Sequence, residues 1–141
     1  MMNSNETEIR AFMDAVWAFW TPSGSKTPPC LLCWARAACL HEIVPRSLDP
    51  EWFTRPLNSV PLCDRCHKAA HEGGHEMRAK LDALALERAT TLMINYGRLD
   101  DEYDEWDLEN PPRVSKGSKP KFGIDGRSVF DIVRAQIKRG A

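Results

Sequence analysis

Two pairs of cysteines have a spacing that suits metal binding. Cys30 and Cys33 form one C-x-x-C turn, and Cys63 and Cys66 form another. Each turn points two thiolates toward one point, so two turns supply the four ligands of a tetrahedral zinc ion. Ordinary buried cysteines are the alternative, but they poorly explain two matched pairs beside a histidine-rich segment. We therefore predict a closed structural zinc site, with the remaining cysteine, Cys39, as a small buried side chain.

Two histidines have a spacing that suits ligands of one further metal ion. His67 and His71 stand four residues apart in a segment expected to be helical, so both rings project from the same side. His41 lies upstream, and Asn58 lies between the two regions. Simpler interpretations remain open for these residues. His67 could cap the zinc site or replace one of its ligands, His71 could be a solvated helix residue, and Asn58 could be a turn residue.

The order of these residues resembles that of the HNH, or ββα-metal, endonucleases, in particular small HNH proteins encoded by bacteriophages. The resemblance covers residues 30–72, under a third of the chain. It rests on His41-Glu42-Ile43-Val44-Pro45-Arg46, on Asn58, and on Leu62-Cys63-Asp64-Arg65-Cys66-His67 with His71. It implies a two-stranded hairpin followed by a helix, which together hold one divalent ion.

The resemblance also implies roles for single residues. His41 and His67, with His71 as a third ligand, would hold a catalytic Mg²⁺ or Mn²⁺, and Asn58 would brace the loop between the strands. Family members commonly carry a histidine general base at the position of Glu42. A glutamate can accept a proton but is a weaker base than imidazole near neutral pH. Glu42 is therefore the base, a metal ligand, or the mark of a weak or inactive nuclease.

The resemblance implies a metal-dependent endonuclease that hydrolyses DNA phosphodiester bonds and nicks one strand as a monomer. The alternative is a weakly active or inactive zinc module that binds DNA or a protein partner. In a third hypothesis the acidic residues 81–112, with a net charge of −7, mimic DNA or bind a basic partner. A solvated linker is the simpler interpretation of that stretch. Four basic residues could contact phosphates or be ordinary surface charge: Arg46, Arg55, Arg65 and Lys68.

Four segments are expected to position these residues in an α+β fold, with a small zinc-stabilised ββα-metal core and flanking α-helices. Residues 1–22 form an amphipathic helix, and residues 23–97 form the zinc-binding domain, which ends in a helix. Residues 98–126 form an acidic and then basic linker, and residues 127–141 form a short helix or tail. The apolar face of the first helix packs on the core or, if exposed, binds a second copy or a protein partner. The helix at 76–96 would bury Met77, Leu81, Leu84, Leu92 and Tyr96.

Composition limits the classes of function. The chain has 141 residues and a net charge of −1. It has no apolar run near the roughly 20 residues of a membrane span, and its polar N-terminus does not resemble a signal peptide. We therefore expect a soluble, cytoplasmic protein, in which cysteine pairs bind metal rather than form disulfides. Residues 26–80 carry +2 and residues 113–141 carry +6, so nucleic acid should contact the centre and the tail.

Overall fold

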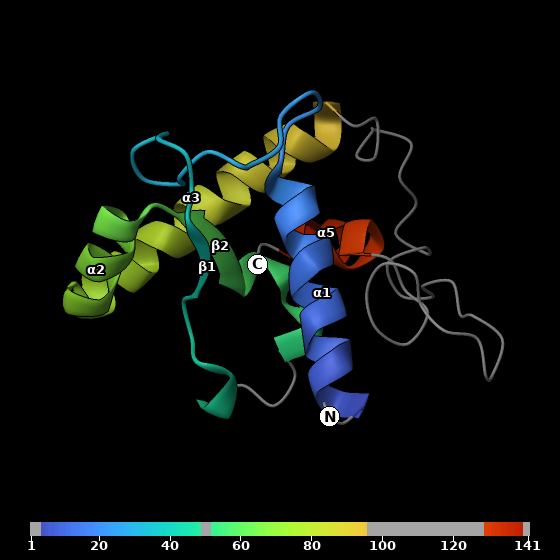
Figure 1. Ribbon diagram of the computed structural model, residues 1–141, viewed down its shortest axis with the longest axis horizontal. Coiled ribbons are helices and arrows are strands. Elements are labelled where there is room, and N and C mark those ends of the chain that lie inside the picture. The colour runs from blue at the N-terminus through green and yellow to red at the C-terminus, as the bar shows by residue number, and fades with distance from the viewer. Residues whose placement is uncertain (1–3, 49–51, 96–128, 140–141) are drawn as a thin grey trace, which may run out of the picture.

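The computed structural model describes residues 4–48, 52–95 and 129–139, which form a mixed α+β fold (Figure 1). The predicted linker 98–126 and Tyr96 lie outside the described residues. The elements are helices α1 (Ser4–Trp20), α2 (Asp64–Glu72), α3 (Gly74–Asn95) and α5 (Val129–Lys138), with strands β1 (Cys39–Glu42) and β2 (Ser59–Leu62). The prediction of an α+β chain is confirmed at this level.

Helix α1 packs its apolar stripe into the core. Phe12, Val16 and Trp20 recur at helical spacing, and each is at most 1% exposed. The indole N–H of Trp20 also donates a hydrogen bond of 2.9 Å to the carbonyl of Ser59 on β2. The structure therefore places this face of α1 against the sheet and the core, as the packed-helix interpretation expects.

Strands β1 and β2 form an antiparallel pair in which His41 lies opposite Val60 and Cys39 lies opposite Leu62. Successive side chains of a strand point to opposite faces of the sheet. Cys39 and His41 therefore share one face of β1, and Glu42 belongs to the other. This alternation determines which of the predicted site residues can meet.

Helices α2 and α3 are separated by the predicted stop at Gly73 and Gly74. Gly74 has a φ of 61°, a left-handed conformation that a glycine adopts without steric cost, and it begins α3 at once. The predicted buried side of α3 was partly wrong, because Leu84 and Leu92 are only partly buried. The buried line instead repeats every four residues and comprises Leu81, Ala85, Ala89 and Met93.

Helix α5 joins the same core as α1 and α3 (Figure 1). Val129 and Val133 are at most 1% exposed, and the ring of Phe130 lies edge-on to Phe19 at a centroid distance of 5.7 Å. The side-chain oxygen of Gln136 accepts a 3.0 Å hydrogen bond from the backbone N–H of Leu57. Among the described helices, none is long and apolar enough to cross a bilayer.

Candidate metal centres

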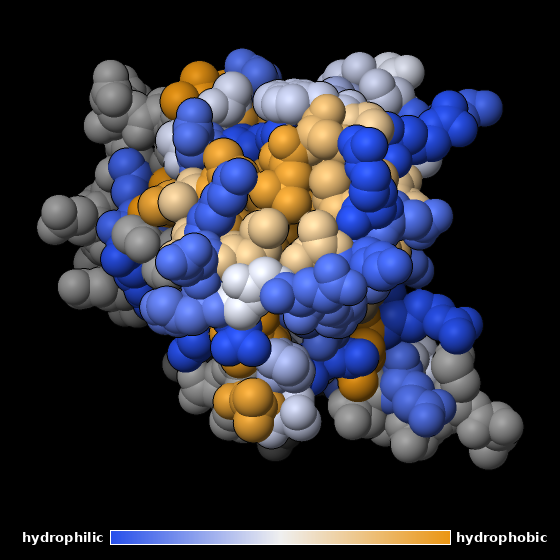
Figure 2. All heavy atoms as spheres, turned by 90° about the vertical axis from the view of Figure 1, so that its left-hand side faces the viewer, coloured by the Kyte–Doolittle hydropathy of each residue, from blue (hydrophilic) through white to orange (hydrophobic). Residues whose placement is uncertain are grey.

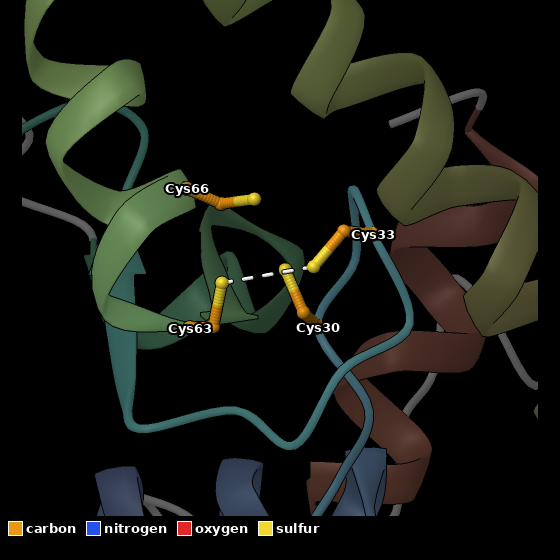
Figure 3. Close-up of side chains that lie close together, drawn as sticks. All are labelled: Cys30, Cys33, Cys63 and Cys66. Carbon is orange, nitrogen blue, oxygen red and sulfur yellow. Dashed lines mark hydrogen bonds between the residues drawn. The ribbon is translucent and has the colours of Figure 1, made fainter.

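The four predicted zinc ligands come together between the loop after α1 and the start of α2. Their Sγ atoms all lie within 4.8 Å of one another and point toward a common centre (Figure 3). The Sγ atoms of Cys33 and Cys63 are 3.6 Å apart. Sulfurs bonded to one tetrahedral zinc ion at about 2.3 Å would be separated by about 3.8 Å. The group could therefore hold a metal ion such as zinc with little movement.

Hydrogen bonds from distant segments hold the first cysteine pair in place. The backbone N–H of Leu31 donates to the carbonyl of Pro61 at 2.8 Å, which joins this turn to β2. The guanidinium of Arg88 on α3 donates to the carbonyls of Pro29, Cys30 and Leu31 at 3.0–3.3 Å. Sequence reasoning missed Arg88, because the carbonyls that it contacts lie 57 to 59 residues away in the chain.

The second cysteine pair is positioned by the start of α2. Cys63 is the N-cap of this helix, and its carbonyl accepts a 2.8 Å hydrogen bond from the backbone N–H of His67. Cys66 therefore projects from the first turn. Burial, and the hydrogen bonds that the Cys66 thiol donates to the other three cysteines, raise the pKa of Cys66 to about 12. Thiolates at this point need a cation to balance their charge, which a bound zinc ion would supply.

The three histidines form a second group that could hold a metal ion. His41 projects from β1 and is 7% exposed, whereas His67 and His71 project from one side of α2. Their ligating nitrogens lie within 4.8 Å of one another, and the Nε2 atoms of His67 and His71 are 2.9 Å apart. Nitrogens on one tetrahedral ion would lie about 3.3 Å apart, so a small rotation of the rings suffices.

Electrostatics keep the buried histidine neutral. Burial and the neighbouring rings of His67 and His71 lower the pKa of His41 to about 4. Its imidazole is therefore uncharged at neutral pH, so that a nitrogen lone pair is available to a metal. Metal binding by histidine requires this neutral form.

Cys39 departs from its predicted role. It is half-buried, and its Sγ lies 3.3 Å from the Nδ1 atom of His67, on the opposite side of that ring from His71. The thiol therefore touches a residue of the histidine group. The alternation of β1 could have indicated this, because Cys39 precedes His41 by two residues and shares its face.

Glu42 lies outside the histidine group. Its carboxylate forms an ion pair with the Nε of Arg46 at 2.7 Å and also accepts a hydrogen bond from the backbone N–H of Arg46. It belongs to the face of β1 opposite to His41. The fold therefore brings His41 and His67 together, while Arg46 holds Glu42 on the other side of the strand.

Asn58 joins the two ends of the loop between the strands by two hydrogen bonds. Its side-chain oxygen accepts a 2.9 Å hydrogen bond from the backbone N–H of Val44, and its side-chain amide donates a 2.8 Å bond to the carbonyl of the same residue. The paired bonds fix the chain just beyond β1 against the start of β2. They thereby limit the movement of the segment that runs from Glu42 to Pro45.

We predict that Asn58→Ala destabilises the protein by about 1–3 kcal/mol, because two backbone groups of Val44 lose their partners. Urea denaturation followed by circular dichroism measures the change. Asn58→Asp is the matched comparison, since it keeps the acceptor for Val44 N–H but sets a carboxylate oxygen against the Val44 carbonyl, and its loss of stability reports on the second bond. Equal stability of the alanine variant and the wild type would contradict a bracing role.

The four predicted phosphate contacts are all exposed, but they differ in their surroundings. Arg65 and Lys68 lie on α2, the helix of His67 and His71, whereas Arg55 lies in the loop before β2. Arg46 is paired with Glu42. Figure 2 shows the face that carries α2, where hydrophilic side chains surround a band of apolar ones. Arg65 and Lys68 are therefore best placed to accompany the histidine group.

No protein-family model, curated protein or solved structure matches this chain.

Proposed function

We propose that this chain is a metal-dependent endonuclease of the HNH type, which hydrolyses phosphodiester bonds of DNA. The convergence of His41, His67 and His71 carries the proposal. A strand and a helix supply these ligands, and the Asn58 bonds to Val44 fix the loop that follows the strand. The order of strand, braced loop, strand and helix is the one that the resemblance implies.

The donor atoms of the histidine group indicate which metal ions it would bind. All three members of the group are imidazoles, which suit transition ions such as Zn²⁺ and Ni²⁺ better than Mg²⁺, a hard ion that prefers oxygen ligands. We therefore expect the histidine group to bind transition-metal ions, Mn²⁺ included, more tightly than Mg²⁺. A divalent ion held there would act as a Lewis acid toward the charged phosphate group.

The surrounding residues supply the other functions that the reaction needs. Arg65 and Lys68 on α2 would bind phosphates on either side of the reacting one. Glu42 would accept a proton from the attacking water, and for this its carboxylate must be released from Arg46. Both side chains of that ion pair are partly exposed, at 40% for Arg46 and 21% for Glu42, so DNA phosphate could compete for the arginine.

The ion pair also favours a second candidate function, an HNH-type module that binds DNA without cutting it. A carboxylate held by Arg46 is less able to accept a proton than a free imidazole would be. In this alternative the histidine group remains a metal site, and Glu42 and Arg46 stabilise the loop after β1.

We expect the zinc-loaded protein to convert supercoiled plasmid to the nicked form when Mn²⁺ or Ni²⁺ is present. Mg²⁺ should support slower conversion, and removing the added ion should lower the rate by at least about 100-fold, because the metal stabilises the transition state directly. Agarose gels of a time course measure the rate. Absence of nicking with every ion would contradict the nuclease proposal.

Variants of Glu42 separate the two candidates. Under the nuclease proposal, Glu42→Gln slows nicking by about 10²–10⁴-fold, the usual contribution of a general base, while metal binding is retained. Under the binding-module alternative, the wild type is inactive and Glu42→His gains cleavage. Arg46→Gln serves as the matched control, because it removes the partner of Glu42 and leaves the carboxylate in place.

A further inference from the structure

A cavity of about 450 Å³ lies beside the first cysteine pair, away from the histidine group. Ser25, Lys26, Thr27 and Arg36 line it. The antiparallel bridge between Pro29 and Arg36 brings the two halves of the loop together around it. Among the described residues, its lining offers two cationic and two hydroxyl groups and no carboxylate. This combination binds phosphate in many proteins, since arginine and lysine neutralise its charge and hydroxyls donate to its oxygens.

The two cations of this cavity have no side-chain partner within the part of the chain that the structure describes. Lys26 and Arg36 are exposed, and neither side chain forms a hydrogen bond or ion pair with a residue of the described ranges 4–48, 52–95 and 129–139. Other arginines are committed, such as Arg46 to Glu42 and Arg88 to backbone carbonyls. Two uncommitted cations over one cavity leave a local positive charge available to an anion.

Trp34 stands on the same turn and is 68% exposed. Its φ is 68°, a left-handed conformation that is unfavourable for a bulky side chain and persists only where the surrounding structure holds it. The guanidinium of Arg88 lies 3.8 Å from the centre of its ring. One face of the indole is thereby fixed by a cation, while the exposure of the side chain leaves the other face open.

The cavity and the indole are close enough to act together. Trp34 precedes Arg36 by two residues, so their Cα atoms are at most about 7.6 Å apart. Figure 1 shows this loop running beside α3, the helix that carries Arg88. A phosphate in the cavity and an aromatic base on the open face of Trp34 could therefore belong to one nucleotide or to adjacent ones.

We propose that loop 25–36 binds an unpaired nucleotide of a nucleic-acid strand. The phosphodiester lies between Lys26 and Arg36, and its base stacks on Trp34. This inference deepens the proposed function by giving the DNA a second contact region on the zinc turn. It rests on that function only for the identity of the ligand as nucleic acid, and it requires no cleavage.

Fluorescence anisotropy of a labelled oligothymidylate, with the full zinc-loaded chain and no other divalent ion, tests the proposal. Trp34→Ala should weaken binding by about 5- to 150-fold, the loss expected for one stacked base, and Trp34→Phe should keep most of the affinity. Lys26→Gln combined with Arg36→Gln should reduce the salt slope of the binding constant by about 1.4, because two phosphate contacts are lost. Arg78→Gln with Lys80→Gln, which removes two exposed cations from α3, is the matched control and should change neither quantity by as much.

Trp34→Gly distinguishes binding from a structural role. Glycine relieves the left-handed strain, so the melting temperature should stay equal or rise while oligothymidylate binding falls. A fall in melting temperature with unchanged binding would overturn the proposal. So would wild-type affinity in both the Trp34 and the Lys26/Arg36 variants.

Two further outcomes distinguish this site from a free-anion site and from the nuclease site. If Lys26→Gln with Arg36→Gln abolishes binding of inorganic phosphate in calorimetry but leaves oligothymidylate binding intact, the cavity takes free anions and the proposal fails. If plasmid is never nicked but these variants lose oligothymidylate binding, the nuclease function fails and this inference stands. Normal nicking with unchanged oligothymidylate binding in these variants would overturn this inference alone.

Discussion

Replacing Cys66 with serine is expected to unfold the protein around its candidate zinc site. A zinc ion held by Cys30, Cys33 and Cys63 would lose its fourth ligand, because a serine hydroxyl does not replace a thiolate on zinc. Structural zinc contributes about 10–16 kcal/mol of binding free energy in small zinc domains, whereas whole domains are stable by only about 5–15 kcal/mol. The loss of one ligand can therefore exceed the stability of the fold.

Zinc content and thermal unfolding, measured together on the purified chain, test this expectation. Cys39→Ser is the matched control, because Cys39 lies outside the four-cysteine group and its change should leave zinc content and the melting transition close to those of the wild type. A Cys66→Ser protein that melts cooperatively at the wild-type temperature with bound zinc would refute the structural site. A strong chelator should reproduce the effect of Cys66→Ser on the wild type.

His67→Ala is expected to abolish nicking while the chain stays folded. The substitution removes one of three imidazoles, and the remaining His41 and His71 cannot hold a divalent ion as tightly. Changes around a metal ligand already lower metal affinity or activity by about 10–100-fold, so loss of a ligand itself should exceed about 100-fold. The partly exposed ring at this position contributes little to the core, so folding should persist.

His75→Ala provides the control for this experiment. His75 is exposed on α3 and is not a member of the histidine group, although it continues the four-residue spacing of His67 and His71. Plasmid nicking, metal content and circular dichroism are compared for the two variants. Equal nicking by His67→Ala and the wild type would refute the histidine site, and equal losses in both variants would show that a histidine ligand is not the cause.

The two expected results differ because the histidine group depends on the cysteine group, whereas the cysteine group does not depend on the histidine group. Cys66 and His67 are neighbours in the first turn of α2, and Cys63 caps that helix. Loss of an ion from the cysteine group should therefore displace His67 and His71 as well, and any ion at the histidine group should be lost with it. Loss of the ion at the histidine group leaves Cys30, Cys33, Cys63 and Cys66 in place, so the zinc and the fold should survive.

Short-range spacing made several features predictable. The interval within each cysteine pair identified the four-cysteine group, and the interval between His67 and His71 placed both rings on one side of α2. The apolar stripe of α1 and the stop at Gly73 and Gly74 were predictable for the same reason. Helix and turn geometry relate residues a few positions apart, and that relation is contained in the sequence.

Contacts between distant segments were not predictable in this way. Arg88 binds carbonyls 57 to 59 residues away, and Gln136 reaches the N–H of Leu57 across 79 residues. The burial of Ala85 and Ala89 on α3 likewise depends on how the elements pack.

The sequence alone therefore determined which residues could bind metal, because ligand type and local spacing are properties of the chain. The tertiary structure decided which of them meet. It brought His41 to α2 through the register of β1 and β2, and it turned Glu42 to the other face, where Arg46 holds it. The physical reason is that a strand alternates its side chains and only pairing and packing select the face that becomes buried.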